Sequence, residues 1–455
     1  MSALVPLAVV VPLVAAAVLI GMSQFGSRRG FDAFAVATAA SVTAICSLLL
    51  IDSARGPTVY WFGGWVPKNG IALGVAFVVE PIALALATLA AVLVTASFIY
   101  TWHFFDTVGN LFHVLMLVFL GAMTGFCLTG DLFTLFVFFE LMSVSAFSLA
   151  GYKIEEEGSL QGALNFAVTN SIGAFFILSA IALLYARTGA LNMAQIGDSL
   201  AKGPADGLVI AAFVFLIAGY FVKAAVVPFH FWLADTYAAA PTPVCVLFAG
   251  ILSELGLYAV ARVYWTMFDG VLGADLGSLR TVMVGAGTLT AIVGALMCWP
   301  QRHIKRLLAF STVSHVGMFL IGLGLFSPVA LAGTVVYLVT DGLVKGVLFL
   351  CAGIMLHRLG SVDELGCDGL GRSFPYTGVL FLLGGLALAG LPPFGTFVGK
   401  AVIEEEAAHL GYPWVAYLMV TASVLTAAPV LRAGARVFWG LGPGDAYDHR
   451  SEAEG

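Results

Sequence analysis

Long apolar segments follow one another along almost the whole chain and limit what it can fold into. Most of these segments reach the roughly 20 residues that a helix needs to cross the hydrocarbon core of a bilayer. Only short polar stretches separate them, and no soluble domain interrupts the series. The predicted spans are 3–21, 33–51, 73–99, 112–129, 131–152, 161–187, 207–233, 242–266, 279–299, 304–326, 329–356, 376–409 and 413–440.

The composition supports a membrane protein of about thirteen helices. Hydrophobic residues make up 60% of the 455 residues and charged residues only 10%, whereas soluble chains carry about 25% charge. The apolar segments are too long for barrel strands, so the fold class is all-α and polytopic. The first segment lacks a basic leader and a cleavage site, so we expect a retained span and not a signal peptide.

Charge and cysteine usage exclude several function classes. The net charge of −6 is spread over loops and offers no basic face for nucleic acid. The six cysteines stand singly, without the paired spacing of a zinc, iron–sulfur or disulfide site. We therefore expect no metal, no cofactor and no catalytic residue in this chain. The cysteines are Cys46, Cys127, Cys245, Cys298, Cys351 and Cys367.

Loop charges predict the orientation in the membrane. The most compact basic run, Arg302 to Arg306, follows span nine. Because positive loops stay in the cytoplasm, we expect this run inside and the N-terminus outside, in a bacterial or archaeal-type cell membrane. The segment 188–200 is typical of a short helix lying at the membrane interface.

The stretch around Lys223 is the strongest functional signal from single residues. Lys223 lies inside an apolar run, and Pro228 follows five residues later. A lysine at that depth costs roughly 2.5–3.5 kcal/mol on insertion scales. Pro228 removes a helical amide, which we expect to leave the carbonyl of Ala224 without its partner. One interpretation is a proton or ion pathway; the other is a snorkelling lysine beside a helix that is kinked for packing.

Further ionisable groups lie within predicted spans, where each could carry a proton. Burial favours the neutral form of a carboxyl group and of an amine, whereas a nearby opposite charge keeps both charged. A Glu–Lys pair that closes and separates can therefore act as a switch. With Lys223, the predicted proton pathway consists of Glu140, Glu254, His315, Asp341, Lys345 and Lys400.

Structural explanations compete with this pathway at several positions. Asp341 and Lys345 are four residues apart on one helix face and could simply neutralise each other. A buried His315 could be held by ordinary hydrogen bonds. Ser253 and Tyr258 could keep Glu254 neutral. Glu140 has no ionisable neighbour within four residues, so its partner must lie on another helix.

A second broken span repeats the pattern of the first. Pro392 and Pro393 interrupt span twelve before Lys400, as Pro228 interrupts span seven after Lys223. The two broken spans lie five spans apart, and an odd number of spans reverses orientation. This spacing predicts two inverted repeats, the architecture of many transporters with sites at discontinuous helices.

In these motifs the chain resembles the antiporter-like subunits shared by Mrp-type multisubunit Na+/H+ antiporters, respiratory complex I and membrane-bound hydrogenases. The similarity covers residues 60–440 and is strongest to the Mrp D subunit, which also shares the Trp61–Trp65 segment. The stretches that carry it are Leu128–Glu140, Lys223–Leu233, Arg306–Gly317 and Gly390–Phe394 with Lys400.

The resemblance implies a fold of two inverted five-helix bundles, spans four to eight and nine to thirteen. The expected domains are 1–111, 112–266 and 279–440, followed by a polar tail at 441–455. The resemblance also implies that Glu140 and Lys223 form a proton-channel pair, that His315 and Lys345 belong to a central axis, and that Lys400 connects to the opposite membrane face.

The chain departs from the family pattern at three points. Span eight has Ser253–Glu254 where a lysine or histidine is usual, so Glu254 could pair with Lys223 or carry protons itself. Span eleven has Thr340–Asp341 where the family has Asn–His before Lys345. The family usually has fourteen spans, and about thirteen are expected here.

The resemblance implies transport of protons, with or without exchange for sodium, in a complex with other membrane subunits. Two alternatives stay open. The chain could be a proton-pumping subunit of complex I or of a hydrogenase, in which partner subunits carry out the redox chemistry and this chain is not an enzyme on its own. It could also be a homologue that only supports assembly.

Overall fold

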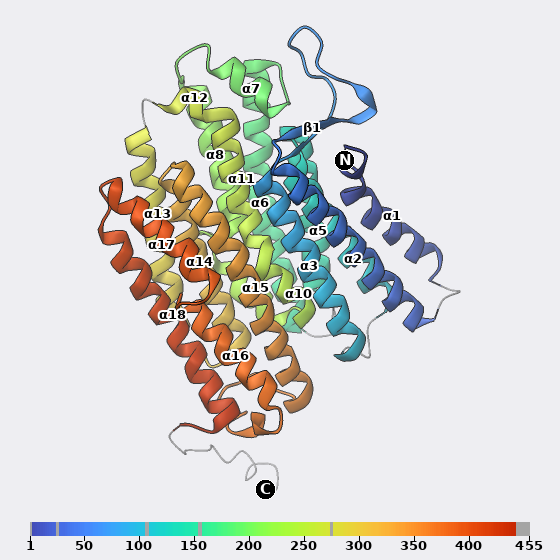
Figure 1. Ribbon diagram of the computed structural model, residues 1–455, viewed down its shortest axis with the longest axis vertical. Coiled ribbons are helices and arrows are strands. Elements are labelled where there is room, and N and C mark those ends of the chain that lie inside the picture. The colour runs from blue at the N-terminus through green and yellow to red at the C-terminus, as the bar shows by residue number, and fades with distance from the viewer. Residues whose placement is uncertain (1, 24–26, 105–108, 153–156, 274–275, 443–455) are drawn as a thin grey trace.

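A computed structural model describes residues 2–23, 27–104, 109–152, 157–273 and 276–442, which form one helical bundle (Figure 1). The predicted tail at 441–455 lies outside the described residues from 443 onward. The long helices are α1 (Leu7–Gly21), α2 (Arg28–Ser53), α3 (Pro81–Phe104), α4 (Asn110–Leu128), α5 (Leu132–Ala150), α6 (Glu157–Thr188), α8 (Gly207–Ala224), α11 (Ser253–Val263), α13 (Leu276–Cys298), α14 (Ile304–Gly324), α15 (Pro328–Leu359), α16 (Pro375–Leu388), α17 (Gly395–His409) and α18 (Trp414–Trp439).

Shorter elements complete the fold. They are helices α7 (Met193–Leu200), α9 (Phe231–Ala239), α10 (Thr242–Leu247) and α12 (Asp269–Leu272), with strands β1 (Thr58–Trp61) and β2 (Ala76–Val79). The two strands pair antiparallel, a small hairpin that the all-α expectation did not include. Figure 1 places α7, α12 and β1 at the end of the bundle that also carries the start of α1. We call this end the α7 face and the other end the opposite face.

The predicted spans are present. In the described ranges, eleven helices are long and apolar enough to cross a membrane. The other two predicted spans are α1, with only 15 residues, and span twelve, which is divided into α16 and α17. Span eight is one long helical stretch from Thr242 to Leu272 that contains π-helical turns at Phe248–Leu252 and Tyr264–Phe268.

Helix ends follow ordinary capping chemistry. The side chains of Asp131, Asn192 and Asp206 accept hydrogen bonds from the first free backbone amides of α5, α7 and α8. The short helix α7 lies within the 188–200 segment that was expected at the interface. Its buried residues are Met193, Ile196 and Leu200, one face of the helix.

Span seven breaks earlier than the sequence predicts. Helix α8 ends at Ala224, and Ala225 has the left-handed conformation with φ of 58°, three residues before Pro228. The expected orphan carbonyl of Ala224 is therefore not the main consequence of the break. The Trp232 indole instead donates to the carbonyl of Val222 at 3.1 Å, and Thr290 of α13 accepts from the amide of Val227 at 3.2 Å. These polar contacts satisfy backbone groups that the break exposes.

Span twelve breaks between Leu388 and Gly395. Gly390 has φ of 69°, and a Cβ there would lie 3.4 Å from the Lys400 Nζ. Glycine therefore both permits the turn and leaves room for the lysine. The Thr396 hydroxyl donates to the carbonyl of Ala387 at 2.6 Å and so bridges the break.

Candidate functional site

Lys223 is fully buried at the last turn of α8, beside the first break. Its ammonium donates to the Ser143 hydroxyl at 2.8 Å and to the Asn170 side-chain oxygen at 3.3 Å. It also lies 4.9 Å from the ring centre of Phe139 and 5.5 Å from that of Phe166. Neutral acceptors and aromatic faces thus hold this cation.

Glu140 lies on α5, one turn before Ser143. It is near enough to interact electrostatically with Lys223, but the contacts under 4 Å to the Lys223 ammonium come from Ser143 and Asn170. Its buried Oε1 atom has no hydrogen-bond partner among the described residues. The two members of the predicted pair are therefore neighbours without a direct ion pair, and Ser143 occupies the hydrogen-bonding position beside the lysine.

A second buried cluster joins α14 and α15. His315 Nδ1 lies 2.7 Å from Asp341 Oδ1, and Lys345 Nζ lies 2.9 Å from Asp341 Oδ2. All three side chains are fully buried. The neutralisation of Lys345 by Asp341 that the four-residue spacing suggested is present, and His315 adds a third member from another helix. Tyr337 hydrogen-bonds His315 at 3.3 Å.

Glu254 belongs to span eight, which contacts α8 beside Lys223 through Gly256 and α15 beside Asp341 through Gly250. It is fully buried on the first turn of α11 and interacts electrostatically with Lys345 and Asp341 of α15. Both carboxyl oxygens lack a hydrogen-bond partner among the described residues. Ser253 and Tyr258, the partners of the alternative explanation, are bonded elsewhere: Ser253 pairs with Tyr237, and Tyr258 donates to the carbonyl of Cys127.

The π-helical turn before Glu254 packs directly on α15. A Cβ on Gly342 would overlap the carbonyl oxygen of Gly250, so these backbones touch one turn before Glu254. Extra-wide turns of this kind often occur at functional sites. The contact joins span eight to the helix that carries Asp341 and Lys345.

Lys400 lies at the far end of the series, on the first turns of α17. Its Nζ donates to the Ser423 hydroxyl at 2.9 Å and lies 3.9 Å from Glu404 Oε1. Ser423 in turn contacts Met318, which also contacts Tyr337 beside His315. A line of buried contacts thus runs from the His315 cluster to Lys400, with the Met318 sulfur as one of its members.

The structure thus places the predicted residues in two groups, Lys223 with Glu140 and the His315 cluster with Glu254, and contacts lead from the second group to Lys400. We call these residues together the buried series. Sequence reasoning missed four neutral members of it: Ser143, Asn170, Tyr337 and Ser423. Asn170 could have been noticed, because an amide in the interior of a predicted span needs a partner. The other three are residue types that occur throughout membrane helices and give no signal on their own.

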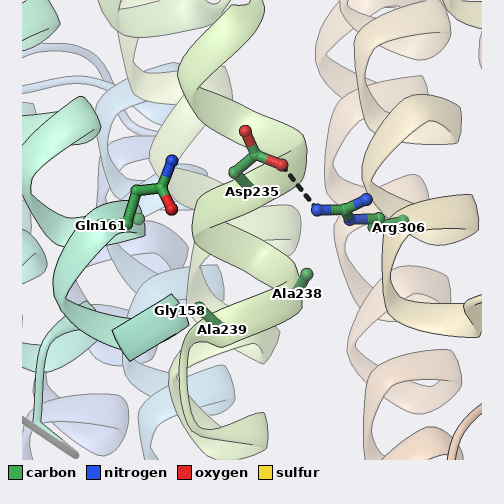
Figure 2. Close-up of a pocket in the computed structure, with 7 residues that line it drawn as sticks. Gly158, Gln161, Asp235, Ala238, Ala239 and Arg306 are labelled. Carbon is green, nitrogen blue, oxygen red and sulfur yellow. Dashed lines mark hydrogen bonds and ion pairs between the residues drawn. The ribbon is translucent and has the colours of Figure 1, made fainter. Parts of the chain in front are cut away.

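A cavity of about 360 Å³ opens beside α9 at the opposite face, lined by α6, α9 and α14. Figure 2 shows the Asp235 carboxylate pointing across it toward Arg306, at 2.8 Å. The neighbouring Lys305 donates to the carbonyls of Ala238 and Ala240 at the end of α9. The half-helix after the first break is therefore tied to α14, which carries His315.

Residues 129–426 match the family described as "NADH:quinone oxidoreductase/Mrp antiporter, TM". The chain belongs to this family. It is 29% identical to the D subunit of the Na(+)/H(+) antiporter of Bacillus subtilis (strain 168), over 97% of this chain and 88% of that protein. It is 32% identical to the N subunit of the NADH-quinone oxidoreductase of Desulforudis audaxviator (strain MP104C), over 94% and 84%.

Solved structures of family complexes share the fold. One is the membrane-bound sulfane sulfur reductase, described as an archaeal respiratory membrane complex, with a TM-score of 0.88 and 28% identity over 96% of this chain and 88% of that one. Another is the Mrp complex from Dietzia sp. DQ12-45-1b, with a TM-score of 0.88 and 28% identity over 97% and 80%. The predicted family resemblance and the helical membrane fold are confirmed.

Proposed function

We propose that this chain is the proton-conducting membrane subunit of a multisubunit cation/proton antiporter, and that protons move along the buried series from Glu140 to Lys400. The observation that carries the proposal is the packing of span eight, which contacts α8 at Ala224, beside Lys223, and α15 at Gly342, beside Asp341. On each side of this contact, serine, asparagine and tyrosine side chains hydrogen-bond the buried ionisable groups of α8, α14 and α17. Isolated packing roles would not require such a sequence of contacts.

The geometry suggests how charge passes along the series. Lys223 is held by neutral acceptors and can give up its proton without breaking an ion pair. Lys345 instead lies 2.9 Å from the Asp341 carboxylate, so movement of its proton requires this ion pair to open or Asp341 to take up a proton. Glu254, near Lys345 and Asp341 and without a hydrogen-bond partner among the described residues, is suited to accept a proton arriving from the Lys223 side.

We further propose that the two broken spans belong to two inverted repeats, residues 112–266 and 279–440, after an N-terminal unit at 1–111. The two lysines occupy different halves of their broken helices. Lys223 ends the half before its break, and Lys400 lies in the half after its break. Both halves extend toward the α7 face, which we propose is the outer face. We therefore propose that the two repeats contribute different parts of a single proton path, and that each does not form a path of its own.

The relatives named as D subunits of Na(+)/H(+) antiporters support an antiporter as the parent complex. We propose that other membrane subunits surround the chain in a cell membrane and that proton movement is exchanged for sodium. A respiratory complex is the second candidate, favoured by the 32% identity to an NADH-quinone oxidoreductase subunit. Co-purification decides between them: iron–sulfur or flavin subunits indicate the respiratory complex, and small membrane subunits alone indicate the antiporter.

Replacement of Lys223 tests the proposed path. Lys223→Ala removes a proton carrier, and such groups contribute roughly 10²–10⁴-fold to proton transfer. We expect proton flux through the reconstituted complex, measured with a pH-sensitive dye in vesicles, to fall at least about tenfold. Subunit composition on gel filtration should be unchanged.

The matched control is Lys202→Ala, which removes an exposed loop lysine and should leave flux unchanged. Normal flux in an assembled Lys223→Ala complex would contradict the path and favour a subunit that only supports assembly.

A further inference from the structure

Beyond Lys400, Glu404 is the first acidic side chain on α17 toward the α7 face. Helix α17 runs from the second break toward that face and ends at His409. Glu404 lies one turn after Lys400 and five residues before the helix end, about 7–8 Å along the axis. Lys400 has a side-chain exposure of 7% and Glu404 of 22%. Exposure thus increases in the direction of the α7 face.

Glu404 has an open position for a proton. Its Oε1 atom is buried and has no hydrogen-bond partner among the described residues. The nearest cation is the Lys400 ammonium, 3.9 Å from that same atom. This distance is within ion-pair range and longer than a hydrogen bond, so a shift of about 1 Å or one bridging water would join the two groups.

The neighbouring acids differ from Glu404. Glu406 accepts a hydrogen bond from the Ser327 hydroxyl at 2.6 Å, which ties it to the start of α15. Glu405 is exposed on the side of α17 that faces away from the bundle. Of these three acids, Glu404 is the one that contacts the series, since Tyr337 as well as Lys400 is in its electrostatic reach.

We propose that Glu404 is the terminal proton carrier on the α7 face. This inference rests on the proposed function, because it needs protons to reach Lys400. In the step, an N–H bond of the Lys400 ammonium breaks and an O–H bond forms on the Glu404 carboxylate. The products are a neutral amine and a carboxylic acid. Glu404 then releases the proton to water at the α7 face, and Lys400 is recharged from the His315 side.

Transport by the reconstituted complex tests this step. Glu404→Gln keeps the size of the side chain and cannot exchange a proton, so flux should fall at least about tenfold. Glu404→Asp keeps a titratable group one methylene shorter, and we expect partial flux with a changed pH profile. The matched control Glu406→Gln removes an acid of the same triplet and should leave the flux and its pH profile unchanged.

Parallel measurement of Lys223→Ala separates the two proposals. Loss of flux in Lys223→Ala with normal flux in Glu404→Gln would overturn the role of Glu404 alone. Normal flux in both would overturn the path itself. If Glu404→Gln does not assemble, Glu404→Asp decides by infrared difference spectroscopy. A carboxyl band that forms on acidification should shift in Glu404→Asp and not in Glu406→Gln, and an unshifted band would overturn the proposal.

Discussion

At the scale of single residues, the buried lysines differ in what holds them. Lys345 lies against a carboxylate at 2.9 Å, whereas Lys223 has a hydroxyl, an amide oxygen and two aromatic rings. A carboxylate fixes the charge of its partner, and neutral acceptors stabilise the cation less strongly. Lys223 is therefore the lysine of this pair whose charge can change with least rearrangement.

This difference makes Asn170 a positioning residue for Lys223. A hydrogen bond to a charged group contributes about 1.5–3 kcal/mol, which corresponds to roughly a tenfold or larger change in an equilibrium. We expect Asn170→Leu to lower proton flux several-fold and to shift its pH profile, because the charged form of Lys223 loses an acceptor. The profile is measured in vesicles across pH.

The matched control for this prediction is on the same helix. Asn165 is exposed, and the Asn165→Leu complex should have the same pH profile of transport as the unmodified complex. An unshifted profile in Asn170→Leu would show that this amide does not tune Lys223.

At the scale of elements, α13 and α14 pack so closely that their backbones are in contact at several glycines. A Cβ on Gly317 of α14 would overlap the backbone nitrogen of Ala291, and a Cβ on Gly287 would lie 2.7 Å from the Gly317 carbonyl oxygen. Small residues permit such contact and supply much of the packing energy between helices in a membrane. This contact fixes α14, and with it His315, two residues earlier.

The packing predicts that alanine substitution at two glycines affects thermal stability differently. Gly317→Ala should lower the midpoint of thermal unfolding of the purified subunit by several degrees, because overpacking costs typically 1–3 kcal/mol. Gly285→Ala, on α13 with nothing within 4 Å of its added Cβ, should leave the midpoint unchanged or raise it through better helix propensity. Equal midpoints for the two variants would refute the close-packing account.

At the scale of the whole molecule, much could be predicted from the sequence. Lysines and carboxylates in apolar runs are rare enough to be found without a structure, and Pro228, Pro392 and Pro393 marked both broken spans. The contacts between them could not be predicted. The placement of Ser143 against Lys223, of Gly250 against Gly342, and of Glu254 near α15 depends on helix rotation and on a π-helical turn, which hydropathy does not encode.

Glu254 is the residue at which proton transfer between the two groups can be tested most directly. In the proposed repeats the Lys223 group belongs to the first and the His315 group to the second. Glu254 lies on span eight of the first repeat, within electrostatic reach of Asp341 and Lys345 in the second. If protons pass from one bundle to the other along a single path, then removal of this titratable group must interrupt it.

The most direct test is proton flux through the reconstituted complex carrying Glu254→Gln, with subunit composition checked on the same preparation. The account predicts a loss of at least about tenfold, since the amide keeps the shape of the side chain and cannot relay a proton. Undiminished flux in the assembled Glu254→Gln complex would contradict a continuous path from Glu140 to Lys400.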